Sequence, residues 1–401
     1  MIVGIDAHNL EGNRTGVGRY LANLLREWSK LNFQFPRQRR GSPGAAISNF
    51  QFILYFKNEI PDDLPKSNLF EKKLLQVGST AKFVHWDLPR AAKKDKVDIL
   101  FCPGYVAPLC YKGRIALVLH DIIYEAHPEW FNWSSRVDKI LLKWVSKKAA
   151  QKSTMIFVPS EFTRQEVIKY YRVNPQKVKL TYLAADLGII LPPPSPRLRR
   201  ASQSFPYKGE AEKLKKFGIM DKFGLYIGSI FSRRYLPEVI GAFGRLAAEK
   251  PDYQLILGGK DYTRARNTDD LIVRENESLG RRAILRVDFI GDSDLKLLYS
   301  ACAFFIYLSD YEGFGLPPLE AMSCGAPVII SDGTSLKEVA EDAAFLIKNN
   351  SDVEEIYRAM KKIVDDANLR SELIVRGRGQ AAKFSWEKCA QETLKALILK
   401  L

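Results

Sequence analysis

The chain has 401 residues, 46% of them hydrophobic and 27% charged, which is ordinary for a folded protein and predicts two or three domains. No run of about 18 apolar residues offers a membrane-spanning helix. The formal net charge of +15 would suit a polyanionic partner: nucleic acid, a phosphorylated substrate or an anionic membrane face. A solvated basic surface explains the same charge, and no zinc-finger, RNA-binding or basic-zipper pattern accompanies it, so nucleic acid is a weak candidate.

The N-terminal residues "MIVGIDAHNL" lack a basic leader followed by an apolar run, so they predict a first strand and not a signal peptide. The cysteines are scattered, odd in number and without C-x-x-C spacing: Cys102, Cys110, Cys302, Cys324 and Cys389. This pattern argues for a reducing compartment and against a disulfide framework or a zinc site, and we expect a cytoplasmic protein.

Short apolar runs alternate with helical patterns in both halves of the chain. Buried strands are predicted for "IVGID", "QFILYF", "DILFC", "IALVLHD" and "TMIFVPS", and then for "FGLYIGS", "YQLILGG", "VDFIG", "CAFFIYLS" and "APVIIS". Helices such as "GRYLANLLREWSK" lie between them, and three more follow at the end of the chain. This alternation predicts an α/β fold with two doubly wound parallel sheets.

Composition sets the expected domain limits. We expect a first domain over residues 1–186, a linker or excursion rich in proline, serine and basic residues over 187–220, a second domain over 221–384, and a final helix over 385–401 with Ser385 as its N-cap. In such sheets ligands bind outside the carboxyl ends of the strands, so the residues that follow each strand are the candidates for chemistry.

The first such segment is the glycine-rich loop "RTGVGRY", which opens a helix. A dinucleotide fingerprint would need a third glycine where Leu21 stands, so that motif is excluded. Backbone N–H groups at a helix start can bind phosphate, and glycines there also make ordinary turns. These residues alone favour neither interpretation for Gly16 and Gly18.

Two arginines, Arg233 and Arg234, follow the strand and glycine of "GSIFSRRY". Guanidinium groups bind phosphate oxygens in pairs and stay charged, so they could stabilise a departing diphosphate. A solvated basic turn is the alternative.

The segment "SDYEGFGLPPLEAMSCGAPVIISD" carries the strongest pattern. Glu312 ends a strand, and the N–H groups of Phe314, Gly315 and Leu316 would point at an anion at the start of a helix that carries Glu320. Carboxylates that accept sugar hydroxyls, beside amides that bind phosphate, describe a site for a sugar nucleotide. A capped helix with solvated acids is the alternative, and it leaves the paired glycines unexplained.

Three further features have two interpretations each. His120 follows a strand and should face the ligand, and His8 lies in the first loop. Asp292–Asp294 match a metal-binding D-x-D, but a helix cap with an acidic first turn explains them better, and we predict no metal. The basic amphipathic segment 139–153 could lie on an anionic membrane, although a domain helix with a solvated lysine face is the commoner explanation.

These motifs together resemble the retaining glycosyltransferases of family 4, which have the two-domain GT-B fold. "EGFGLPPLE" fits the E-x(7)-E motif of that family, and "TGVGRY", "LHDIIYEAHPEWF", "VPSEFTRQEVIKYY", "LYIGSI" and "FIGDSDLKLLYSAC" are similar to family segments in the same order. The resemblance covers nearly the whole chain outside the linker and "SPGAAISNF". It implies two Rossmann-like domains with an interdomain cleft and a C-terminal helix that returns to the first domain.

The resemblance also implies roles for individual residues in the second domain. Glu312 would bind hydroxyls of the transferred sugar, and Glu320 would bind the ribose. The edge of the sugar and the phosphates would be bound by the backbone amides of Phe314, Gly315 and Leu316. Further donor contacts are implied for the arginine pair, in which Arg234 replaces the usual lysine. Ser229 stands where some members have another arginine. Lys260 and Phe289–Ile290 would lie around the base.

In the first domain, Gly16 would lie near the diphosphate, with Gly18 in the same loop, and His120 beside the anomeric carbon. Arg19, Tyr20 and His8 would lie on the acceptor side. The implied reaction moves a hexose from a nucleotide-diphosphate sugar to a glycan or lipid-linked hydroxyl, with retention, no cofactor and no required metal. Resemblance to polysaccharide-building members favours GDP-mannose as donor, and peripheral contact with the inner face of a membrane is a further expectation. The alternatives are a nucleotide-sugar epimerase of the same fold, and a basic protein that binds nucleic acid or an anionic surface.

Overall fold

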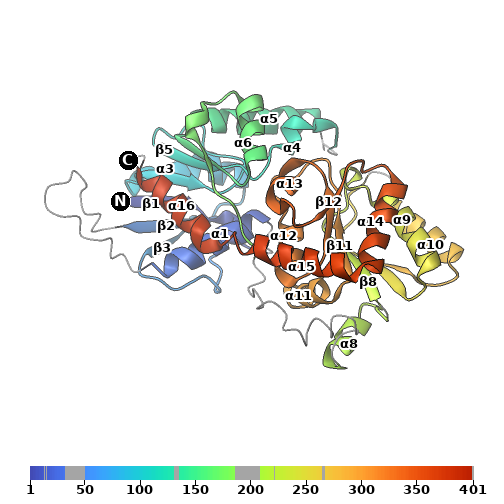
Figure 1. Ribbon diagram of the computed structural model, residues 1–401. Helices are drawn as coiled ribbons and strands as arrows, with labels where there is room; N and C mark the ends of the chain where they lie inside the picture. Colours follow the sequence, from blue (N-terminus) through green and yellow to red (C-terminus); the bar gives the residue numbers. More distant parts are fainter. Residues whose placement is uncertain are drawn as a thin grey trace. The chain divides into compact units, whose positions relative to one another are not determined.

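The computed structural model describes residues 1–12, 14, 16–31, 50–130, 135–185, 208–220, 222–263 and 267–399. The chain divides into two compact units, Met1–Leu183 with Trp386–Leu401, and Ala184–Ser385. Each unit is a parallel sheet with helices on both of its faces (Figure 1).

The first unit contains a seven-stranded sheet in the order β3-β2-β1-β4-β5-β6-β7, in which every pair is parallel. Its strands are β1 Ile2–Asp6, β2 Gln51–Phe56, β3 Phe70–Leu74, β4 Ile99–Cys102, β5 Arg114–Val118, β6 Met155–Val158 and β7 Val178–Leu180. The central strands are almost wholly buried, as strands covered on both faces must be.

The helices of the first unit include a final one from the far end of the chain. They are α1 Gly16–Ser29, α2 Thr80–Lys82, α3 Leu88–Lys94, α4 Ile123–Ala126, α5 Arg136–Lys152, α6 Glu161–Tyr171 and α16 Trp386–Leu399, with shorter turns η1 His8–Leu10, η2 Phe83–Asp87, η3 Pro128–Trp130 and η4 Pro175–Lys177. Helices α1 and α16 pack side by side, and the indole N–H of Trp28 donates to the carbonyl of Ala390 at 3.0 Å.

The second unit contains a six-stranded parallel sheet in the order β10-β9-β8-β11-β12-β13. Its strands are β8 Lys222–Ile227, β9 Tyr253–Gly258, β10 Ile284–Val287, β11 Phe304–Tyr307, β12 Val328–Ser331 and β13 Phe345–Ile347. Its helices are α8 Lys208–Lys215, α9 Leu236–Glu249, α10 Thr268–Ser278, α11 Asp292–Ala301, α12 Leu316–Cys324, α13 Thr334–Ala340, α14 Val353–Asp365 and α15 Ala367–Ala381, with the turn η5 Ser232–Arg234.

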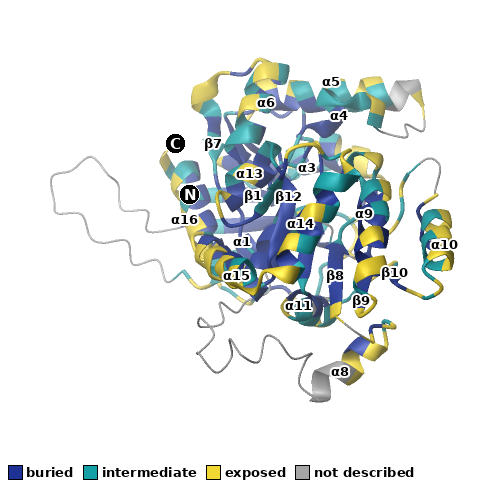
Figure 2. Ribbon diagram, turned by 45° about the vertical axis from the view of Figure 1, so that its right-hand side comes forward, coloured by how far each residue is buried: buried dark blue, intermediate teal, exposed yellow. Residues whose placement is uncertain are grey.

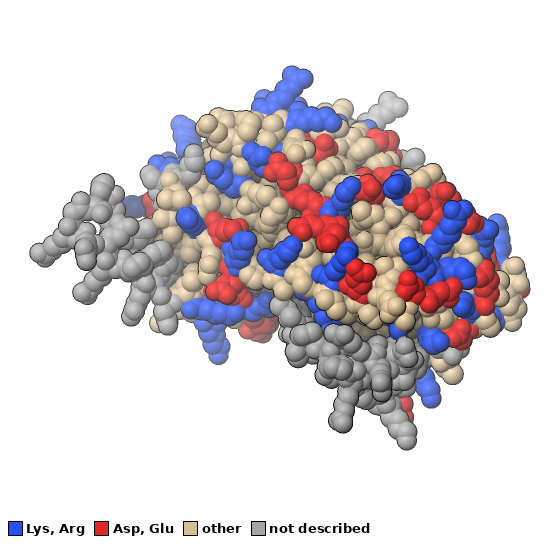
Figure 3. Space-filling view, in the orientation of Figure 1, with Lys and Arg blue, Asp and Glu red and all other residues tan. Residues whose placement is uncertain are grey.

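Burial follows these layers. The central strands of both sheets are dark blue in Figure 2, whereas the helices are blue on the face toward the sheet and yellow on the face toward solvent. On the face shown in Figure 3, basic and acidic side chains lie close to one another among uncharged residues, and several of them form ion pairs in the second unit.

Two of the sequence predictions need correction. Strand β10 lies at 284–287, ahead of the predicted "VDFIG", so that Phe289 and Ile290 follow the strand. The predicted linker or excursion over 187–220 stays a prediction: it includes the helix Lys208–Lys215, and residues 187–207 lie outside the described residues. Helix α11 begins at Asp292 itself, and Gly291 occupies its N-cap position.

The strand order fixes where a ligand should bind within each unit. The order reverses between β1 and β4 in the first sheet and between β8 and β11 in the second. Open α/β sheets bind ligands at such switch points, beyond the carboxyl ends of the two strands. The segments that follow β8 and β11 therefore define the candidate site of the second unit.

Candidate functional site

An arginine lies buried at the carboxyl ends of β8 and β11. Arg234 belongs to the η5 turn after β8 and is 7% exposed. Its Nη1 donates to the carbonyl of Ser229 at 2.6 Å, and its guanidinium lies over the ring of Tyr307 at 4.8 Å from the centroid. A buried guanidinium is stable only when its donors are paired, so each of these contacts holds it in place.

The main partner of this arginine is Glu312, which lies 78 residues further along the chain, in the loop after β11. Arg234 Nε and Nη2 lie 3.1 and 3.0 Å from Glu312 Oε1. The hydroxyl of Ser309 donates to the same oxygen at 2.8 Å. Burial by itself would lower the pKa of Arg234, but Glu312 together with Tyr307 and Tyr226 outweighs it and holds that pKa well above its usual range, so the guanidinium stays charged.

All three contacts end on one oxygen of Glu312. Among the described residues, no hydrogen bond or ion pair is recorded for the other oxygen, Oε2. A carboxylate oxygen accepts up to two hydrogen bonds, so Oε2 retains the capacity to accept from hydroxyl groups of a ligand. The pair with Arg234 thus orients Glu312 and leaves one acceptor atom available.

Glycines make this close packing feasible. A Cβ at Gly228 would lie 2.6 Å from Arg234 Nη1, and Gly228 has φ of +151°. A Cβ at Gly259, which follows β9, would lie 2.1 Å from the carbonyl oxygen of Gly228. The two strand ends therefore approach each other closely enough that a side chain at either position would displace the arginine or the backbone.

Helix α12 begins immediately beyond Glu312. Gly315, with φ of +96°, occupies its N-cap position, and two prolines, Pro317 and Pro318, lie in the first turn. The hydroxyl of Ser335 donates to the carbonyl of Glu312 at 2.7 Å and holds the loop against α13. The first N–H groups of a helix have no acceptor within the helix, and together with the dipole they favour an anion here.

The second acid of the motif, Glu320, lies on α12 and is 3% exposed. The hydroxyl of Tyr299 donates to Glu320 Oε2 at 3.3 Å, and burial together with Glu320 holds the pKa of Tyr299 well above its usual range. The phenol is therefore a proton donor at all working pH values, and it orients the carboxylate of Glu320 on the buried face of the helix.

Aromatic and basic side chains surround the start of this region. The half-buried Arg233 lies over the ring of Phe231 at 4.4 Å, and Phe231 stacks on Tyr262 with centroids 5.4 Å apart. Lys260 is exposed and its ammonium lies 5.6 Å from the centroid of Tyr262, while Phe289 is 83% exposed. Exposed aromatic faces of this kind can stack on a planar base. Ile290, next to Phe289, is half-buried.

The first unit has its own cluster at the carboxyl end of β5. His120 Nε2 lies 3.0 Å from the carbonyl oxygen of Pro103, the residue after β4. A carbonyl only accepts, so Nε2 carries the proton and Nδ1 presents a lone pair. Burial lowers the pKa of His120 to about 4, although the bond to Pro103 acts in the opposite direction, so the imidazole is neutral near pH 7.

Tyr20 lies behind this histidine and is 2% exposed. Its ring meets His120 edge-on at 4.9 Å and lies 6.1 Å from Trp386 of α16. In this position Tyr20 supports the imidazole and does not face solvent. The neighbouring Arg19 is half-buried on α1.

The two glycines of the first loop have different environments. Gly16 is exposed at the first position of α1, and a Cβ there would meet nothing within 4 Å. A Cβ at Gly18 would lie 2.2 Å from the carbonyl oxygen of Asn9. Gly18 is therefore required by packing, whereas Gly16 is open to a ligand.

His8 follows β1 and pairs with a buried acid. Its Nδ1 lies 2.5 Å from Oδ1 of Asp6, which is 2% exposed. Burial lowers the pKa of His8, but the charge and hydrogen bond of Asp6 outweigh it, and the pKa lies above its ordinary value. The pair is a second polar cluster at the carboxyl edge of the same sheet.

Sequence reasoning missed several supporting residues. Tyr226 and Tyr307 contact Arg234, Ser309 donates to Glu312, and Asp6 pairs with His8. Ser309 and Asp6 do stand at strand ends, which is the signal that could have found them. One acid of the D-x-D motif forms an ion pair on the exposed side of α11, where Asp294 Oδ2 lies 2.6 Å from Lys216 Nζ.

Two family models match most of the chain. The model described as Glycosyltransferase Family 4 matches residues 14–188, and the model described as Glycosyl transferases group 1 matches residues 210–380. The chain is 32% identical over 290 residues to the O-antigen chain mannosyltransferase B of Escherichia coli, which covers 71% of this chain and 70% of that protein. It is 31% identical over 283 residues to the serotype-specific mannosyltransferase WbdA of Escherichia coli. This alignment covers 69% of this chain and 32% of WbdA, so the chain spans about a third of that relative.

A solved structure shows the same fold. HepE of Anabaena in complex with UDP and glucose matches with a TM-score of 0.67 at 15% identity, over 99% of this chain and 98% of HepE. The two Rossmann-like sheets thus form the GT-B fold. With the sequence relatives, this establishes that the chain is a glycosyltransferase and belongs to glycosyltransferase family 4.

Proposed function

We propose that this glycosyltransferase moves mannose from GDP-mannose to a hydroxyl of a glycan or lipid-linked acceptor, with retention at the anomeric carbon and without a metal ion. The donor is inferred from the mannosyltransferase names of both relatives described above. The observation that carries the site is the buried Arg234–Glu312 pair at the ends of β8 and β11, next to the first turn of α12.

In this proposal the second unit binds the donor. Glu312 Oε2 accepts hydrogen bonds from sugar hydroxyls, and Glu320 accepts them from the ribose. The N–H groups of Phe314, Gly315 and Leu316 bind the diphosphate at the start of α12. Lys260, Phe289 and Ile290 border the base, and the backbone of Ser229 is fixed by Arg234.

The reaction exchanges one bond for another at the anomeric carbon. The bond from that carbon to the diphosphate oxygen breaks while the acceptor oxygen forms a new bond on the same face. The acceptor proton passes to the departing diphosphate, whose growing negative charge Arg233 and Arg234 stabilise. The positive groups of the chain thereby supply the neutralisation that other enzymes obtain from a divalent ion.

The first unit provides the remaining groups. The Nε2–H group of neutral His120 donates a hydrogen bond to the carbonyl of Pro103, and Nδ1 accepts one from a hydroxyl of the sugar undergoing transfer. Gly16 contributes an N–H group at the start of α1, and Gly18 shapes that loop. Arg19 and the Asp6–His8 pair are assigned to the acceptor, with Tyr20 behind His120.

We propose that the protein acts in a reducing cytoplasm, and the five free cysteines support this proposal. Among the described residues no helix has the length and apolar character needed to cross a bilayer. We also propose that the protein contacts the inner face of an anionic membrane peripherally.

The test is a panel of GDP, UDP and ADP sugars, with thermal stabilisation and nucleotide release as readouts. GDP-mannose should give the largest response, Glu320→Ala should weaken its binding about 10- to 100-fold, and Glu277→Ala on the exposed side of α10 should not. No response to any nucleotide sugar would refute the proposal. An inverted product, by anomeric proton coupling, would refute retention, and activity abolished by EDTA and restored by a divalent ion would refute metal independence.

A further inference from the structure

A tryptophan lies exposed on the helical segment that follows β3. Trp86, in the turn η2, is 54% exposed, and it is the one large apolar side chain that is exposed within residues 80–94, all of which the structure describes. A single exposed apolar side chain is common and by itself indicates no function. The contacts of this indole and the place of its turn in the fold therefore decide what it can bind.

An arginine holds the indole in place. The guanidinium carbon of Arg90, on α3, lies over the ring of Trp86 at 3.8 Å from the centroid, which is a close cation–π contact. Among the described residues, no hydrogen bond or ion pair is recorded for Arg90. Its N–H groups can therefore donate to a ligand that lies against the ring. The pair presents a fixed aromatic surface with hydrogen-bond donors at its border.

The backbone of this turn is wider than that of an α-helix. The N–H group of Leu88 donates to the carbonyl of Phe83, five residues earlier, which is the π-helical pattern. Such turns are rare and frequently occur at functional sites. The ring of Phe83 is fully buried and meets the ring of His8 edge-on, with centroids 5.5 Å apart. The turn that carries Trp86 thus packs directly on a residue that we assign to the acceptor.

The path of the chain places Trp86 away from the reacting groups. The helical residues 80–94 begin shortly after the carboxyl end of β3 and lead back to the amino end of β4. Both strands belong to one parallel sheet, so this segment crosses from the carboxyl edge of the sheet to the opposite edge. Trp86 lies midway along it, whereas His120 lies at the carboxyl edge. A ligand on Trp86 would therefore extend from the catalytic edge along the side of the first unit.

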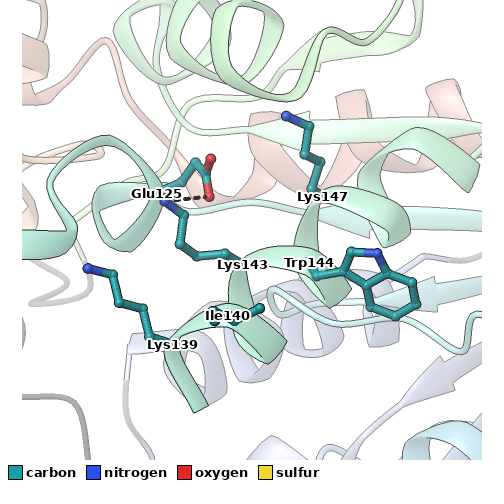
Figure 4. Close-up of a pocket in the computed structure, with 6 residues that line it drawn as sticks. All are labelled: Glu125, Lys139, Ile140, Lys143, Trp144 and Lys147. Atoms are coloured by element: carbon teal, nitrogen blue, oxygen red, sulfur yellow. Dashed lines mark ion pairs between the residues drawn. The ribbon is translucent and has the colours of Figure 1, made fainter. Parts of the chain in front are cut away.

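The neighbours of Trp86 indicate the kind of ligand. A second tryptophan, Trp144, is 52% exposed and projects from α5 together with the exposed Ile140 (Figure 4), as suits an extended apolar partner. Four residues before and after Trp86, in contrast, the exposed side chains are Lys82 and Arg90. A lone indole bordered by hydrogen-bond donors matches a sugar ring, which has C–H groups on its face and hydroxyls around its border.

We propose that Trp86 and Arg90 form a binding subsite for an uncharged glycan, which holds sugar residues of the acceptor remote from the hydroxyl that reacts. A pyranose ring stacks its C–H face on the indole, and its hydroxyls accept hydrogen bonds from the guanidinium. A glycan is the favoured occupant because the chain is a glycosyltransferase. The subsite rests on the glycan acceptor of the proposed function, and it goes beyond that function by assigning a separate site to the part of the acceptor that does not react.

The first experiment is calorimetric titration of the full chain with α-linked mannohexaose, without any nucleotide sugar. The wild type should bind the hexaose more tightly than it binds mannose. Trp86→Ala should weaken binding of the hexaose about tenfold, and Trp86→Tyr should weaken it less than about threefold because tyrosine keeps an aromatic face. Arg90→Ala should weaken it about three- to tenfold. A wild type that does not bind the hexaose, or unchanged binding in Trp86→Ala, would overturn the proposal.

Transfer kinetics test the position of the subsite. With mannohexaose as acceptor, Trp86→Ala should raise KM about tenfold and leave kcat unchanged, and with methyl mannoside neither constant should change. An equal rise in KM for both acceptors, or a fall in kcat, would put Trp86 at the reacting end and overturn the proposal. If the wild type transfers to neither acceptor, the proposed function is wrong, and the titration without donor still decides whether the subsite binds glycan.

Matched controls separate a glycan from other partners. Trp144→Ala removes an equally exposed indole and should bind the hexaose as the wild type does. Lys93→Ser with Lys94→Ser removes two exposed charges from α3, and neither this change nor added salt should affect an uncharged ligand. A loss in the lysine variant would indicate an anionic partner and overturn the proposal. So would a Trp86→Ala variant that binds the hexaose normally but sediments less with phosphatidylglycerol vesicles. Unchanged melting temperatures confirm that the variants fold.

Discussion

At the scale of single residues, the buried ion pair of the second unit has two separable functions. Arg234 fixes one oxygen of Glu312, and Glu312 keeps the arginine charged in a nearly dry site. Breaking such a pair leaves a lone buried charge, whereas replacing both partners by apolar groups removes the charge altogether. Stability and catalysis should therefore respond differently to single and double replacements.

We expect Arg234→Met to lower the free energy of unfolding by about 3–5 kcal/mol and to abolish sugar transfer. Arg234→Met with Glu312→Leu should recover most of the stability and none of the activity. Urea unfolding and nucleotide release measure the two effects. Arg358→Met, which breaks an exposed pair with Glu354, is the control and should leave the free energy of unfolding nearly unchanged. Equal losses at the two arginines would contradict the structure.

His120 predicts a pH dependence. Its pKa is about 4 in the folded chain and about 6.5 when unfolded. Between these values the unfolded chain binds a proton that the folded chain does not, so stability falls as the pH falls through this window. His120→Asn should remove a loss of about 3 kcal/mol between pH 6.5 and 4. Chemical denaturation at several pH values measures how the free energy of unfolding of the wild type and of His120→Asn depends on pH. The same dependence in both proteins would mean that the imidazole is exposed to water.

At the scale of elements, the first turn of α1 distinguishes a packing glycine from an open one. Gly18→Ala drives a methyl group against the carbonyl of Asn9 and should lower stability by about 1–3 kcal/mol. Gly16→Ala meets no atom and should change stability by less than about 0.5 kcal/mol. It should still weaken donor turnover if the loop approaches the diphosphate. Melting temperatures and transfer rates check both changes, and equal melting temperatures would refute the packing role of Gly18.

The sequence predicted elements where local composition was sufficient. Central strands such as β1 and β9 are continuous apolar runs and were recognised. Strands β3 and β7 were missed because they lie at the edges of the sheet and read "FEKKL" and "VKL". Edge strands are half-exposed, so their residues need not be apolar.

The candidate site was predicted only in its local parts. The E-x(7)-E segment and the arginine pair were identified as separate motifs, each at a strand end. That Arg234 contacts Glu312 depends on β8 and β11 being neighbours in the sheet, and no local pattern encodes the order of strands. The burial of Tyr20 likewise depends on Trp386, which lies at the other end of the chain.

At the scale of the whole molecule, α16 belongs to the first unit although the second unit precedes it in the chain. It buries Trp386, Cys389 and Leu397. Ending the chain at Ser385 should therefore destabilise the first unit selectively, while the second unit keeps its fold. Hydrogen exchange should show loss of protection in α1 and β1 but not in β8 and β11. Removal of residues 400–401 alone is the control, and uniform loss of protection in both units would contradict this division.

The bond from Trp28 to Ala390 joins residues 362 positions apart, and this separation orders events during synthesis. A ribosome releases the whole of the second unit before the last helix of the first unit has emerged. The nascent first unit must wait, without α16 against Trp28 and Tyr20, for the time that translation of the second unit takes. The second unit, contiguous in the chain, can reach its final form earlier, so the unit that is made first is completed last.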